Sequence, residues 1–250
     1  MLTAELRAEQ QRIAERATAE MLSLFGALQF KDVDATAPAF IEASVSVADR
    51  YHREASALGG DMYLSMRRDA GVAGHFTVAR PEFDDVQLRR DLIILGPVSA
   101  KKLMGQGVRI RDAAKSVFTL TSGRVATAAL AGSRDTISRS TNADQQAIAY
   151  ARQPASGACD FCMLMAENTY TDAYSAMYSL GTRKRAKAPQ PMGSKFHDHC
   201  RCTLLPLFAG QIAPGARDRQ AFLAEWAAAS HQGQGFREFV EQKQGFSLSK

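Results

Sequence analysis

The stretch RIRDAAKSVFTLTSGRVATAALA at residues 109–131 decides the fold class of this chain. It is the longest run of good helix formers in the middle of the sequence. Its apolar side chains recur at helical spacing: Ala113, Val117, Leu120, Val125, Ala129 and Leu130. Gly132-Ser133 then predicts the end of this helix, and a further helical turn is expected over residues 135–139. The stretch therefore predicts a long amphipathic helix.

The chain before this stretch has the same helical character. Apolar residues three, four and seven positions apart predict helices over residues 3–28, 34–66, 84–95 and 99–105. Gly59-Gly60 is expected to kink or break the second helix, and Gly96-Pro97 to stop the third. Residues 71–81 are expected to form a loop. Residues 1–135 therefore predict a bundle of helices with short connections.

The character of the sequence changes from about residue 142. We expect a helix over residues 142–151, a short helix over 173–180 and a strand over 203–208. A last helix is expected over residues 216–243, with an interruption at residues 233–235. We accordingly divide the chain into a helical domain at 1–140, a small module at 141–210 and a C-terminal helical tail at 211–250.

The composition is that of an ordinary soluble globular protein. Of the 250 residues, 46% are hydrophobic and 23% are charged, which allows a large core without covalent crosslinks. No apolar run reaches the roughly 18–20 residues of a membrane span, and the charged N-terminus lacks the apolar region of a secretory signal. We therefore expect a reducing cytoplasm, where cysteines are thiols or metal ligands. The net charge of +5 is compatible with a position beside nucleic acid but is not diagnostic of it.

All four cysteines lie between residues 159 and 202, together with two histidines. One group is a Cys-x-x-Cys pair, and the other is the sequence HDHCRC at residues 197–202. Two-residue gaps let both flanking side chains face one ion, and zinc takes four thiolate or imidazole ligands in a tetrahedron. The candidate ligands are Cys159, Cys162, His197, Cys200 and Cys202, with His199 as a competitor. The spacing predicts one structural zinc ion that crosslinks the two groups.

Other interpretations of these cysteines are weaker. A disulfide framework conflicts with the missing signal peptide. A redox Cys-x-x-Cys pair would open a helix after a strand, whereas Cys159 follows a loop in a helical region. A catalytic zinc ion needs an open coordination position, which four protein ligands do not leave. Glu167, which we consider as a catalytic base, is expected to be solvated.

The order Cys159-x-x-Cys162 and His197-x-x-Cys200-Arg201-Cys202 resembles the closing module of the Mu F-like phage minor head proteins. GSRDTI at 132–137, AYAR at 149–152 and ACDFCMLMA at 158–166 are similar to the form found in phages of actinobacteria, as is FHDHCRC at 196–202. The resemblance is strongest over residues 130–208. It implies that the family's zinc ligands lie at the five positions above, and it leaves open which four bind. We favour His197 over His199.

The resemblance implies a non-enzymatic minor capsid protein of phage head morphogenesis. Such a protein is assembled in the host cytoplasm and lies in the virion, inside the capsid, in contact with the portal protein and the major capsid protein. With the helical pattern, the predicted fold is mainly α: an N-terminal helical bundle, then a small zinc-stapled α+β module and a C-terminal helix. A second hypothesis is a capsid maturation protease or another metal-dependent hydrolase. A third is a nucleic-acid-binding zinc module.

Basic side chains also suggest a partner. Arg183, Lys184, Arg185 and Lys187 lie between the two ligand groups, where they could contact packaged DNA or an acidic portal surface, or simply be solvated. Arg67-Arg68 and Arg89-Arg90 are expected to be ordinary charged helix faces. His52 and His75 are expected to be structural. Four aromatic residues are expected in the core or at an interface: Phe222, Trp226, Phe236 and Phe239.

Overall fold

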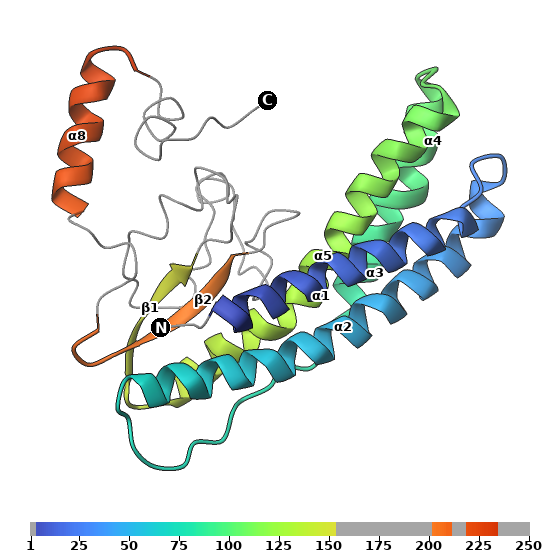
Figure 1. Cartoon of the computed structure of the whole chain (residues 1–250). Coiled ribbons are helices and arrows are strands. Elements are labelled where there is room, and N and C mark those ends of the chain that lie inside the picture. Colours follow the sequence, from blue (N-terminus) through green and yellow to red (C-terminus); the bar gives the residue numbers. More distant parts are fainter. Residues whose placement is uncertain (1–3, 154–201, 212–218, 235–250) are drawn as a thin grey trace.

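The computed structural model describes residues 4–153, 202–211 and 219–234. In this part of the chain, three long helices lie side by side and carry a two-stranded sheet near one end (Figure 1). The long helices are α1 (Ala4–Leu24), α2 (Val33–Asp69) and α5 (Ile110–Ala143). The shorter helical elements are η1 (Phe25–Ala27), α3 (Asp85–Ile93), η2 (Ile94–Val98), α4 (Ser99–Gly105) and α8 (Arg219–His231). The strands are β1 (Ala147–Gln153) and β2 (Thr203–Phe208). The mainly helical prediction is confirmed.

The apolar stripes of the helices meet in two hydrophobic clusters. The cluster near the sheet joins Ile13 of α1 and Met62 of α2 to Leu205 of β2. The other cluster joins Met21 and Phe40 to helices α3, α4 and α5. Helices α1 and α2 therefore each bury one face, as their spacing predicted. Helix α5 differs, because its residues 121–141 are buried on nearly all sides. Among the described helices, none combines the length and the hydropathy of a transmembrane span.

Helices α2 and α5 pack backbone against backbone. A Cβ atom at Gly132 would overlap the carbonyl oxygen of His52, and one at Gly59 would lie 2.7 Å from the Cα atom of Ser133. Glycine at these positions serves close packing and does not end a helix. The predictions that Gly132-Ser133 ends α5 and that Gly59-Gly60 breaks α2 are therefore wrong, because both helices continue past these residues.

Gly96-Pro97 does not stop the helical path either. The chain passes from α3 into α4 through the π-helical turn η2, which contains Pro97. Proline lacks the N–H group that an α-helix would use, and a wider turn accommodates the loss. The Ser99 hydroxyl donates to the carbonyl oxygen of Ile94 at 2.8 Å, so Ser99 supports this turn and does not cap the next helix.

A buried polar network ends α5 and starts β1. The carboxylate of Asp144 accepts hydrogen bonds from Tyr63 and Arg67, each at 2.9 Å, and from the backbone N–H of Gln146 at 3.0 Å. Burial alone would raise the pKa of Asp144, but these hydrogen bonds outweigh it and lower the pKa. Arg67 is therefore a buried ion-pair partner, and the expectation of an ordinary charged face is wrong for it.

The chain after Asp144 is extended, so the helix predicted over residues 142–151 is wrong. β1 pairs antiparallel with β2, placing Ala151 opposite Leu205 and Tyr150 opposite Pro206. The strand predicted over residues 203–208 is confirmed, and every one of its residues is buried. The segment is a strand because it hydrogen-bonds to β2, which begins 50 residues after β1 ends. Local helix propensity contains no information about such a distant partner. The domain boundary at residue 140 stays a prediction.

Replacing Gly132 by alanine should lower the free energy of unfolding by about 3 kcal/mol, because the new methyl group overlaps a backbone carbonyl that cannot move without separating α2 from α5. Urea unfolding followed by circular dichroism measures the change. Gly105→Ala is the matched control, since its Cβ meets open space and should cost less than about 0.5 kcal/mol. Equal stability of the two variants would contradict the tight packing.

Candidate metal centre

The sheet brings the two ends of segment 154–201 together. Gln153 at the end of β1 lies opposite Thr203 at the start of β2. Neighbouring strands in a sheet are about 5 Å apart. The segment that carries most of the candidate metal ligands therefore leaves and re-enters the described structure at one point, at the same end of the sheet (Figure 1).

Cys202 lies at this point, directly before β2. Only 1% of its surface is exposed, and it belongs to the hydrophobic cluster that includes Tyr150 and Leu204. Its carbonyl oxygen accepts a hydrogen bond of 2.9 Å from Nε of Arg134 on α5. A charged donor makes this a stronger contact than a neutral hydrogen bond. The backbone of this candidate ligand is thereby fixed to the longest helix in the middle of the chain.

Most of the sequence-predicted site lies outside the described residues. This holds for the candidate ligands Cys159, Cys162, His197, His199 and Cys200, for Glu167, and for the basic run Arg183, Lys184, Arg185 and Lys187. Within residues 4–153, 202–211 and 219–234, no group of three metal-ligating side chains occurs. The metal centre therefore stays a prediction, and Cys202 is the candidate ligand whose surroundings the structure describes.

The described end of the site is compatible with zinc. A buried cysteine supplies the soft sulfur ligand that zinc prefers. Cys200 precedes Cys202 by two residues, and Cys159 follows Gln153 by six. A chain of six residues spans at most about 20 Å. The paired strands therefore keep both candidate ligand groups within reach of one another.

Two buried arginines beside the sheet were not recognised from the sequence as part of a site. Arg134 is 0% exposed and Arg152 of β1 is 1% exposed. Next to Arg134, the Oδ1 atom of Asp135 is enclosed and accepts no hydrogen bond from the described residues. Burial raises the pKa of Asp135 from its ordinary value near 3.8 to about 6, against the opposing attraction of Arg134 and Arg139. The sequence signal for these residues is the motif Ser133-Arg134-Asp135, in which two charged residues follow the small and apolar residues at 125–133.

Three other side chains singled out in the sequence are His52, His75 and Arg89. His52 is buried against the ring of Phe83, with centroids 5.2 Å apart, and burial lowers the pKa of its imidazole. His75 is exposed in the loop after α2. Arg89 pairs with Glu42 and Asp85 on the surface, as expected of a charged helix face.

A groove lies between α2 and α3. Its volume is about 350 Å³, and much of its lining is apolar: Ala37, Pro38, Ile41, Ile93 and Pro97. Asp34, Glu42 and Arg89 also line it, and all three are in ion pairs. The groove offers apolar contact to a partner and no evident reactive group.

Comparison with known proteins identifies one family. A family model described as VG15 protein matches residues 2–229, which is most of the chain. A search of the curated proteins finds no match, and a search of the solved structures finds none either.

Replacing Asp135 by asparagine should remove a pH dependence of stability. The folded pKa of about 6 lies above the ordinary value of 3.8, so the stabilising contribution of this carboxyl is complete below about pH 4 and is lost as pH rises through about 6. Between pH 4 and pH 7, the free energy of unfolding of the variant should therefore rise by up to about 3 kcal/mol relative to that of wild type. Urea titrations at both pH values measure this, with Asp61→Asn on the exposed face of α2 as the control. A pH-independent difference for D135N would contradict it.

Proposed function

Because this chain belongs to the VG15 protein family, which is phage-related, we propose that it is a minor capsid protein of a phage head. It acts without catalysis, inside the capsid near the portal, and it contacts the portal protein and the major capsid protein. The family match supports a phage protein, and the resemblance of residues 130–208 to the Mu F-like module supports the more specific role.

One structural observation carries this proposal: the pairing of Gln153 with Thr203. It makes the ligand-bearing segment an insertion held at both ends by one sheet, on the end of a helical bundle. A segment fixed in this way can be presented to a partner surface without losing its attachment to the body. The same arrangement suits a structural crosslink in the insertion better than a solvent-open catalytic site.

The proposed cofactor is one structural zinc ion. Four of the five residues Cys159, Cys162, His197, Cys200 and Cys202 would hold it. When bound, zinc supplies a crosslink between thiolate and imidazole groups and leaves no position for substrate water. The chain's own contribution is the fixed backbone of Cys202, which Arg134 anchors to α5. Ordering a ligand before the ion binds lowers the entropic cost of binding.

We expect the purified protein to contain about one zinc ion per chain. His197→Ala should lower the zinc retained in the presence of a chelator, whereas His199→Ala should not. The reason is that the family resemblance places the histidine ligand at His197, whereas the two-residue spacing is shared by His197 with Cys200 and by His199 with Cys202. Metal analysis after dialysis measures this, with His75→Ala in the exposed loop as the control.

Helical circular dichroism shows whether each variant is still folded, so that lost zinc is not confused with unfolding. Retention of zinc by H197A together with its loss from H199A would reverse the assignment. Absence of zinc from wild type, with the thiols of Cys159, Cys162 and Cys200 freely reactive, would remove the metal from the proposal.

Assembly of phage heads tests the proposed location inside the capsid near the portal. When the portal and major capsid proteins of the same phage are co-expressed with this chain, purified heads should contain it in few copies, and heads assembled without portal should contain little or none. Quantitative mass spectrometry of the heads measures the copy number. Exclusion of the chain from portal-containing heads would refute the minor capsid role. Cleavage of the capsid precursor that depends on the chain would favour the protease hypothesis instead.

A further inference from the structure

The charges of the bundle are separated along the chain. Residues 1–91, which include α1, α2 and α3, contain eleven basic and fifteen acidic side chains. Residues 99–115 contain five basic side chains and one acidic one. This second range comprises α4 and the first turns of α5, and we call it the α4–α5 hairpin. The net charge of +5 is therefore unevenly distributed. Residues 1–91, which we call the body, are acidic, whereas the α4–α5 hairpin is strongly basic.

Eight of the fifteen carboxylates of the body form ion pairs within the described part of the same molecule. Ion pairs join helices or successive turns of one helix: Glu9 with Arg12, Glu20 with Arg50, Asp49 with Arg53, Glu54 with Arg16, and Glu42 with Arg89. These side chains already satisfy one another. The acidic body of a second copy therefore offers the basic hairpin fewer unengaged anions than the continuous phosphates of duplex DNA do.

The hairpin is different, because most of its cations lack an acidic neighbour. Lys101 pairs with Asp34, and Arg109 pairs with Asp112 at 2.8 Å. Lys102, Arg111 and Lys115 are exposed and form no ion pair with any described residue. They retain their full charge for an external partner.

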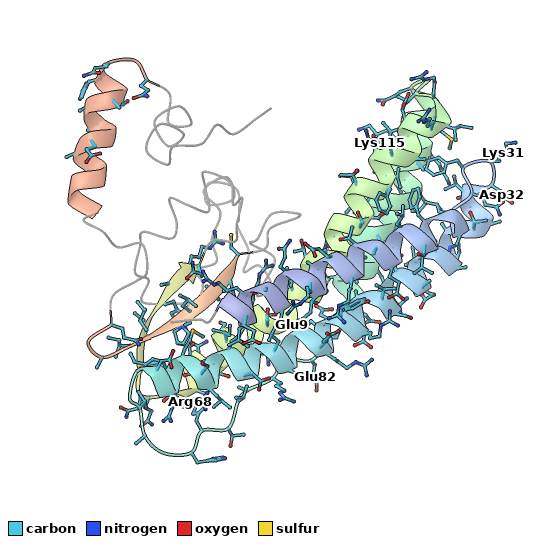
Figure 2. The ribbon with its side chains drawn as sticks, viewed as in Figure 1. Glu9, Lys31, Asp32, Arg68, Glu82 and Lys115 are labelled. Carbon is cyan, nitrogen blue, oxygen red and sulfur yellow. The ribbon has the colours of Figure 1, made fainter. Side chains whose placement is uncertain are left out.

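These three cations belong to two helices that pack against each other, α4 and α5. Arg111 and Lys115 are four residues apart on α5, so they share one helix face. Lys102 lies on α4, which packs against α5 and turns into it at residues 106–109. Figure 2 shows Lys115 at the end of the bundle remote from the sheet, whereas Arg68 lies at the sheet end.

We propose that the α4–α5 hairpin binds the phosphodiester backbone of duplex DNA without sequence preference. Duplex DNA carries one negative charge per about 1.7 Å of helix axis, which gives several phosphates within the span of three neighbouring cations. Contacts of lysine and arginine to phosphates position a protein and do not read bases. The proposed surface does not include the run at residues 183–187, and the inference does not depend on the zinc centre.

The test is DNA binding by the full-length protein and two charge-matched variants. The probe is a fluorescent duplex of mixed sequence, about 30 base pairs long, titrated over a range of salt concentrations. Three phosphate contacts predict that log K falls against log salt with a slope of about −3. K102Q/R111Q/K115Q should weaken binding at least about tenfold at low salt and flatten that slope.

The control is R7Q/R68Q/R80Q, which removes three exposed arginines and changes the net charge by the same amount. It should bind within about threefold of wild type, because its substitutions lie outside the proposed surface. All six substituted side chains are exposed, so each variant should fold, and circular dichroism confirms this.

Three results would overturn the proposal. The first is the absence of DNA binding by wild type. The second is equal weakening by the hairpin variant and the control, or weakening only by R183Q/K184Q/R185Q, which would move the contact to that segment. The third is a hairpin variant that binds DNA normally but no longer enters portal-containing heads, because the hairpin would then recognise an acidic protein surface.

Discussion

The close approach of α2 to α5 is the constraint on which the described fold depends. Gly132 lets the backbone of α5 lie against the carbonyl group of His52, and Gly59 does the same for α2 against Ser133. At this distance the hydroxyl groups of Ser56 and Thr136 share a buried hydrogen bond of 2.8 Å. Both hydrophobic clusters are built on these two helices. A larger side chain at the contact would separate the helices and loosen both clusters together.

Helix α5, which this contact fixes against α2, runs from the basic hairpin to the sheet. Its first turns belong to the basic hairpin, its middle anchors Cys202 through Arg134, and its last residue leads into the network around Asp144. A helix of 34 residues is about 50 Å long. Because α5 runs without interruption, the hairpin and the strand-bound end of the candidate metal centre are fixed at a distance from each other. A protein that bridges two partners needs such a spacer.

Local sequence pattern predicted the helices well and their ends poorly. Periodicity located α1 and α2, because a helix that buries one face has apolar residues at regular spacing. Helix α5 is buried on nearly all sides over residues 121–141, and its run of good helix formers located it instead. Local pattern predicts helix ends at Gly132 and Pro97, because a sequence does not show whether a glycine faces another backbone or whether a π-helical turn accommodates a proline. Arg67 resembled any surface arginine, because its partner Asp144 lies 77 residues away. The candidate ligands came from spacing and resemblance, whereas the anchoring role of Arg134 depends on a tertiary contact.

The cations of this protein play opposite physical roles at the two ends of the bundle. Arg67 and Arg134 are buried, and their hydrogen bonds to Asp144 and Cys202 hold the sheet end together. Buried pairs are shielded from mobile ions, so salt weakens them little. Lys102 and Lys115 are exposed, and any attraction that they exert falls with ionic strength over a Debye length of about 10 Å. Salt should therefore release a partner from the hairpin while the sheet end stays intact, and net charge alone could not have distinguished the two ends.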